Sequence, residues 1–333
     1  SLIKFNLELA PHAAAKMHDI ALPETILLQG SFNPATLELA VDQGGVFSDD
    51  YSLSGKGNAS LAASDTLNFV FEFRYPNLTA LTQSQLGSAF LTLTVAGTSA
   101  HPALQASGTI TPASLEERGF SDVIITAMMP DAQEFKAALA VQSTYKAQPV
   151  KLNADIVYDT SDIILQSLHV TAPGLALSGR GKFFMQNALF DGKLYLTAKD
   201  IARHQTLLGA EIGGDVEADI TFQPLQQAQS MAVHGFFKNA QFYAYDAERI
   251  AFDGDFADTR SLWPRNATIL VSNLVLTDKM SLGSTAIHFK KTAGNAYELS
   301  LDLQGRIPSP LTIKGSAAFT DLTEGIPSIH AID

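Results

Sequence analysis

The stretch LNFVFEFRYPNLTALTQSQLGSAFLTLTVAGTSAHPALQASGTI, from Leu67 to Ile110, decides the fold of this chain. In residues 67–75 large aromatic side chains occupy every second position, and mostly polar or smaller residues lie between them. An extended strand turns alternate side chains to opposite sides, so this spacing predicts a β-strand in a sheet with one dry face. The aromatic residues of that face are Phe69, Phe71, Phe73 and Tyr75.

A short connection and two further strands complete this stretch. Residues 77–87 carry Asn77, placed to begin a helical turn, and Gly87, placed to end it. The next segment, 88–97, alternates again, and the chain then turns and runs back. The sequence therefore predicts a unit of strand, helical plug, strand, turn and strand. The apolar side of the second strand is formed by Leu91, Leu93 and Val95.

The same unit recurs later in the chain. Residues 200–209 form the second helical plug, with Asp200 as its cap, and two glycines in each copy are separated by the same number of residues. We therefore predict an internal repeat, with copies near 67–130 and 194–256. The apolar sides of the strands before and after the second plug are formed by Leu194, Leu196, Ile220 and Phe222.

Composition indicates an ordered, all-β protein. Of 333 residues, 46% are hydrophobic and only 17% are charged, and 20 Phe accompany a single Trp. No long helical pattern is present. The net charge of −12, without a Lys/Arg cluster, argues against nucleic acid as a partner.

The sequence contains no recognisable catalytic, cofactor or metal site. The absence of cysteine excludes disulfides and thiolate ligands, and the eight histidines are scattered. The glycine-rich segments 55–58 and 179–182 lie between predicted strands, so we interpret them as bulges or turns and not as phosphate loops. Residues 253–258 only faintly match a calcium loop, and we interpret them as a turn. We therefore predict no enzyme activity, no cofactor and no metal.

A sheet with one apolar face must cover that face, normally with helices or a second sheet. Long helices are missing, and a closed barrel of so many strands would be too wide for side chains to fill. An ordinary β-sandwich core is the alternative interpretation of the apolar stripe. We predict instead a long, curled antiparallel or mixed sheet that forms a U-shaped groove with an apolar interior and short helical plugs. Because no linker interrupts the pattern, we expect one continuous segment over residues 1–333.

Three segments, 95–110, 207–222 and 299–319, repeat glycines beside predicted strands, and the first and third also carry proline between their glycines. In this they resemble the TamB family of the AsmA-like group of bacterial envelope proteins. The resemblance implies a U-shaped periplasmic sheet, anchored in the inner membrane of a Gram-negative bacterium by segments missing from this chain. It also implies an outer-membrane, TamA-like barrel of the Omp85 type as partner. The opening residues, SLIKFNLELA, have the pattern of a strand inside a sheet, so we expect a fragment of a longer protein.

The resemblance and the apolar stripe together predict a protein that carries phospholipid between the inner and outer membranes along a hydrophobic groove. The alternative is a lipid-free scaffold that supports outer-membrane protein assembly and autotransporter secretion by pairing with unfolded strands. A surface adhesin or carbohydrate-active β-helix fits less well, since no polar or aromatic cleft is visible. The residues expected to contact acyl chains are Phe69, Phe71, Phe73, Leu91, Leu93, Val95, Leu194, Leu196, Ile220, Phe222, Leu299 and Leu301.

Overall fold

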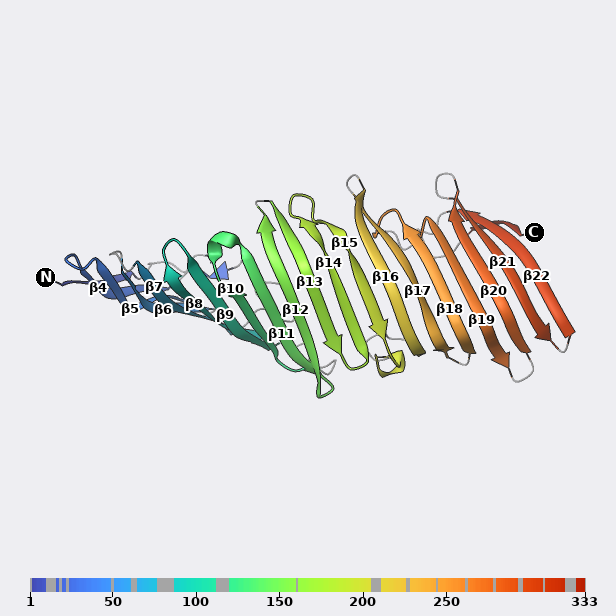
Figure 1. Ribbon diagram of the computed structural model, residues 1–333, viewed down its shortest axis with the longest axis horizontal. Helices are drawn as coiled ribbons and strands as arrows, with labels where there is room; N and C mark the ends of the chain where they lie inside the picture. Colours follow the sequence, from blue (N-terminus) through green and yellow to red (C-terminus); the bar gives the residue numbers. More distant parts are fainter. Residues whose placement is uncertain are drawn as a thin grey trace. The chain divides into compact units, whose positions relative to one another are not determined.

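The computed structural model divides the chain into two compact units, residues 1–159 and 160–333. In both units nearly all described residues belong to β-strands (Figure 1). The copies of the predicted repeat fall in different units. The structure describes residues 2–332 except for 10–15, 18–19, 22–23, 49–50, 61–64, 77–86, 112–119, 160, 205–210, 226–227, 244, 261–262, 278–279, 293–295, 308 and 321–327.

The first unit is an antiparallel sheet in which the strands from β4 onward pair in chain order, and β1 pairs with β4. A separate small hairpin joins β2, Lys16–Met17, to β3, Ile20–Ala21. The strands of the sheet are β1 Ile3–Leu9, β4 Thr25–Asn33, β5 Glu38–Phe47, β6 Ser52–Ser60, β7 Thr66–Tyr75, β8 Ser88–Thr98, β9 Pro102–Thr111, β10 Val123–Met129, β11 Lys136–Tyr145 and β12 Gln148–Asp159.

The second unit is likewise an antiparallel sheet whose strands pair in chain order. Its strands are β13 Asp162–Ala172, β14 Leu175–Phe184, β15 Leu189–Ala198, β16 Ile212–Leu225, β17 Ala228–Phe242, β18 Tyr245–Phe256, β19 Asn266–Thr277, β20 Met280–Lys291, β21 Ala296–Ile307, β22 Ser309–Thr320 and β23 Ser328–Ile332. The predicted fold class, an open all-β sheet with almost no helix, is confirmed. Among the described residues, the strand pairs within both units are all antiparallel.

Helical structure among the described residues is limited to two 3-10 turns, η1 Ala132–Glu134 and η2 Ile201–His204. The first was not predicted; Asp131 caps it by accepting a hydrogen bond from the Gln133 amide. The second lies in the plug expected over 200–209. There the Asp200 carbonyl accepts from the Arg203 amide, whereas the Asp200 carboxylate binds the Arg203 guanidinium. The plug expected over 77–87 lies outside the described residues, apart from Gly87.

Strand register separates two faces of each sheet, because residues directly opposite one another in neighbouring strands point to the same side. In the first unit Phe71 of β7 is opposite Gly55 of β6 and Leu93 of β8. Leu93 is opposite Ala106 of β9. We call the side that these residues share the apolar face, and the opposite side, with Lys56 and Glu72, the polar face. In the second unit the side that carries Leu194 is the apolar face.

Large side chains from neighbouring strands lie over glycines of the apolar face. A Cβ atom built on Gly55 would lie 2.5 Å from Cδ1 of Phe71, and one on Gly235 would lie 2.7 Å from Cζ of Phe252. The glycines of segments 55–58 and 179–182 therefore lie inside strands, and the prediction of turns is wrong there. A β-bulge does lie opposite each segment, but its extra residues belong to the preceding strand. That strand is β5 for segment 55–58 and β13 for segment 179–182.

A line of inserted residues crosses the second unit from β17 to β20. Each of these four strands has one residue more than strict alternation allows, so apolar side chains keep to one face on both sides of the insertion. Two of these residues have left-handed backbones, with φ of +49° at Asn239 and +52° at Asn273. We call this line the seam; its residues are Asn239, Glu248, Asn273 and Gly283.

Candidate apolar binding face

Register places the six candidate residues of β7 and β8 as three directly opposed pairs on the apolar face of the first unit. These pairs are Phe69 with Val95, Phe71 with Leu93, and Phe73 with Leu91. The rings of Phe69 and Phe71 are stacked, with centroids 6.2 Å apart. The structure therefore brings these residues together as one continuous apolar surface.

The six candidate residues of the second unit also lie on one face. Leu194 is opposite Ile220, and Phe222 packs edge-on against Phe190 with ring centroids 5.8 Å apart. Further along the same sheet, Leu299 is opposite Phe289 and Leu301 is opposite Ile287. Leu196 is opposite Ala218.

The described strand positions on the apolar face of the first unit carry no charged side chain. Register leaves no Asp, Glu, Lys or Arg at any described position of this face in β1 and in β4 through β12. In the described strands of the second unit Lys291, at the end of β20, is the one exception. An ionised group would have to leave water if this face were covered by an apolar partner, so its absence keeps such covering favourable.

The apolar face is open to solvent in the first unit. Leu28, Leu53 and Leu93 keep 38%, 38% and 37% of their surface exposed, although each lies between apolar neighbours from adjacent strands. A second layer of protein would bury such residues almost completely. No second sheet or helix covers this face in the part of the chain that the structure describes.

A hollow of about 340 Å³ lies in the apolar face between β4 and β7. Gly44 and Gly55 form part of its floor, since neither has a side chain to fill it. The sequence-based prediction included Phe69 and Phe71 but missed the other residues here, although the alternation in residues 25–33 and 38–41 could have identified Ile26, Leu28 and Val41. The apolar side chains that line the hollow include Ile26, Leu28, Val41, Val46, Leu53, Phe69 and Phe71.

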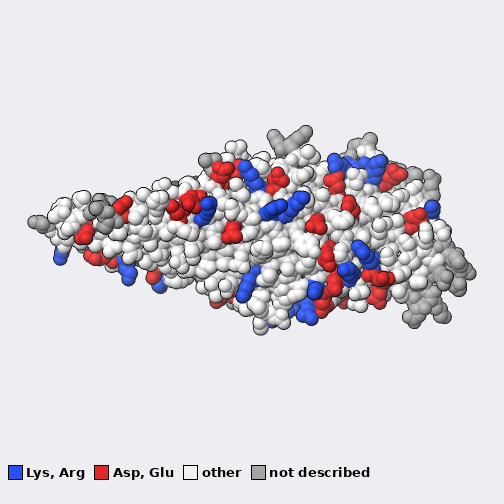
Figure 2. Space-filling view, in the orientation of Figure 1, with Lys and Arg blue, Asp and Glu red and all other residues white. Residues whose placement is uncertain are grey.

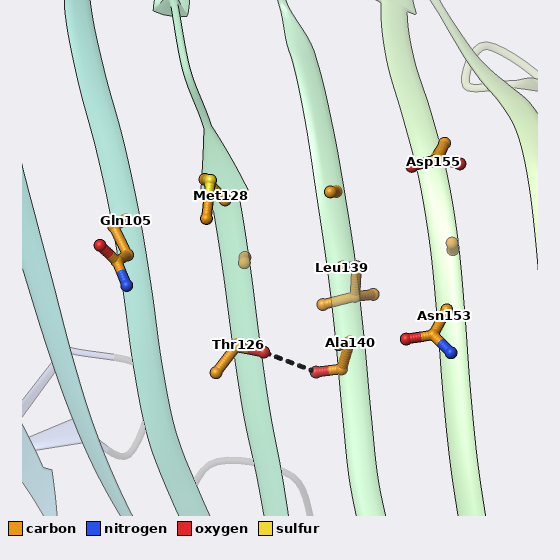
Figure 3. Close-up of a pocket in the computed structure, with 10 residues that line it drawn as sticks. Gln105, Thr126, Met128, Leu139, Ala140, Asn153 and Asp155 are labelled. Carbon is orange, nitrogen blue, oxygen red and sulfur yellow. Dashed lines mark hydrogen bonds between the residues drawn. The ribbon is translucent and has the colours of Figure 1, made fainter.

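The polar face has a different character. Figure 2 shows acidic and basic side chains interspersed over the surface in view. In the first unit this face holds a smaller hollow of about 270 Å³, whose lining includes Ala138 and Ala140; Figure 3 shows several of its lining residues. Gln105, Asn153 and Asp155 stand around it, and the Thr126 hydroxyl donates to the Ala140 carbonyl at 3.5 Å. Amide and carboxylate groups would repel an acyl chain, so the two faces offer different chemistry.

The carboxylates of residues 253–258 are bound by bases. Asp253 lies 3.0 Å from His234, Asp255 pairs with Arg265, and Asp258 pairs with Arg260 at 2.7 Å. Hydrogen bonds from Arg260 lower the pKa of Asp258. Residues 253–256 belong to β18, so the prediction of a turn over the whole segment is wrong.

Two further observations concern the described residues as a whole. No group of three or more His, Asp or Glu side chains is placed to share a metal ion there. No helix in these residues has both the length and the apolar character that crossing a membrane requires.

One ion pair links neighbouring turns of the first unit. His101 Nδ1, in the turn between β8 and β9, lies 2.7 Å from Asp131 Oδ2, beside η1. The hydrogen bond with His101, followed by the one from the Gln133 amide, lowers the pKa of Asp131. The contact joins the turn after β8 to the turn after β10, so it is a tertiary contact that the sequence alone did not reveal.

The seam was also missed by sequence reasoning. The side chains of Asn239, Glu248 and Asn273 line a hollow of about 300 Å³ together with polar-face residues. The Asn273 amide donates to the Glu248 carboxylate. A usable signal existed, because Asn or Gly interrupts apolar alternation in most of these strands.

Comparison of the chain with protein-family models, with characterised proteins and with solved structures gives no significant match.

Proposed function

We propose that this chain binds the acyl chains of phospholipids along its apolar face and carries them between two membranes. The observation that supports this most is the first unit's apolar face, which is free of charge in its described strands and yet open to solvent. A soluble protein rarely leaves such a surface uncovered unless it receives a partner.

The energetics favour an alkyl chain as that partner. Each methylene group that leaves water contributes about 0.8 kcal/mol. The hollow between β4 and β7 offers Leu28, Leu53 and Phe71 as contacts and almost no polar surface. A lining of this kind holds a chain without fixing its register, which permits movement along the face.

The cellular setting is part of the proposal and comes from the resemblance of segments 95–110, 207–222 and 299–319 to the TamB family. It comprises a periplasmic location, an inner-membrane anchor outside this chain, and an Omp85-type barrel as partner. The role proposed is binding and transfer, without catalysis. The alternative function, a lipid-free scaffold for unfolded outer-membrane strands, stays a prediction, and the experiment described next also tests it.

The test is native mass spectrometry of the purified 333-residue chain, with lipids identified after extraction. We expect bound phospholipid, and we expect Phe222→Asp to reduce it severalfold. Thr221→Asp is the matched control, because residue 221 lies on the polar face opposite Lys193. Protein that carries no lipid under any condition and binds an alternating strand peptide instead would overturn the proposal in favour of the scaffold.

A further inference from the structure

Lys291 is the one charged residue at an apolar-face position of the described strands. It lies at the end of β20, directly opposite Tyr297 of β21, and its Nζ is 5.6 Å from the centre of the Tyr297 ring. The alkyl part of such a side chain can lie on an apolar surface while the ammonium group stays in water. Lys291 therefore marks the boundary of the apolar face at this end of the strands.

Aromatic side chains surround this boundary. Trp263 stacks on Phe289, with ring centroids 5.7 Å apart, and lies 6.3 Å from the Tyr297 ring. Trp263 keeps 41% of its surface exposed, whereas Phe289 keeps 9%. Amphipathic aromatic rings beside lysine are typical of places where an apolar phase meets water.

Among the charged groups near the edge of the apolar face, the ammonium group of Lys291 is left available for a ligand. Arg260 pairs with Asp258 and Arg265 pairs with Asp255, so both guanidinium groups are occupied. Lys290 lies on the polar face, directly opposite Glu298, whereas Lys291 forms no ion pair with the residues that the structure describes. Figure 2 shows Lys and Arg side chains gathered at the upper edge of the second unit.

We infer that Lys291 binds the anionic phosphate head of an amphiphile whose alkyl chain lies along the apolar face. This inference rests on the proposed function and adds where the head is held. The chain carries a net charge of −12, so most of its surface repels anions, and Lys291 at the edge of the apolar face provides a local exception. An ammonium group offers three donors to phosphate oxygens.

Trp263 provides a local readout, because it is the only tryptophan in the chain. Its fluorescence would be titrated in the whole chain with decyl phosphate, with the neutral alcohol decanol and with inorganic phosphate. We expect decyl phosphate to bind about fivefold more tightly than decanol, the order expected of one exposed ion pair. Lys291→Gln should abolish this preference. Lys193→Gln, on the polar face, should retain it.

Inorganic phosphate alone should leave the fluorescence unchanged at the same concentrations. A preference for decyl phosphate that survives Lys291→Gln would overturn the inference, as would inorganic phosphate binding as tightly as decyl phosphate. If both decyl compounds bind equally well to the unmodified chain, the inference is wrong and the proposed function stands. If neither binds here and native mass spectrometry finds no lipid, the proposed function itself is wrong.

Discussion

Replacing Leu93 by Asp tests the central claim about the apolar face. Leu93 lies opposite Phe71 and Ala106, in the middle of the face, and keeps 37% of its surface exposed. In the free protein the new carboxylate can therefore stay hydrated, and the loss of partial burial costs about 1 to 2 kcal/mol of folding stability. An alkyl chain lying over it would have to remove that water.

Covering the carboxylate costs about 2 to 3 kcal/mol, which corresponds to a roughly 30- to 150-fold loss of affinity. The assay is displacement of a fatty acid that carries an environment-sensitive fluorophore, with folding checked by chemical denaturation. Thr94→Asp is the matched control, because Thr94 lies one position further on the polar face, opposite Val70. Equal affinity in Leu93→Asp and the unmodified chain, or an equal loss in Thr94→Asp, would refute the reasoning.

Two further predictions concern stability. The lowered pKa of Asp131 means that its contact with His101 contributes stability above the unfolded pKa of about 3.9 and loses it as pH falls through the lower folded value. Denaturation midpoints of the unmodified chain and Asp131→Asn should therefore differ at pH 6 and approach one another as the pH falls through the lowered pKa of the folded state; a constant difference would contradict this. At the seam, Asn273 has φ of +52°, so Asn273→Val should be less stable than Asn273→Gly by about 1 to 2 kcal/mol in urea unfolding, and equal stability would show that the backbone there relaxes freely.

The alternation of side chains was the part of the fold that sequence could predict well. A strand has a side-chain period of two, so the apolar side of β7 follows from Phe69, Phe71 and Phe73 without knowledge of any neighbour. The absence of long helical patterns likewise predicted an open all-β sheet. These properties depend on residues close in the chain.

The prediction of turns at two glycine-rich segments was wrong because it used only residues close in the chain. Glycines in segments 55–58 and 179–182 looked like turn residues, because glycine is the usual residue of tight turns. In the sheet they lie beneath Phe71 and other large side chains from the neighbouring strands. That pairing depends on a different strand, and the glycines alone do not specify it.

The alternation of apolar residues within Leu67–Ile110 is thus a local property of the sequence. The hollow, the seam and the position of Lys291 depend instead on strand register. The hollow needs Gly44 of β5 and Gly55 of β6 beside Phe71 of β7. The seam needs inserted residues at the same level in four strands, and the exceptional position of Lys291 is visible only once every other face position is known. Register is set by pairing between strands distant in sequence, and a shift of one residue would move each side chain to the other face. For this reason only the tertiary structure could decide which apolar residues form one surface.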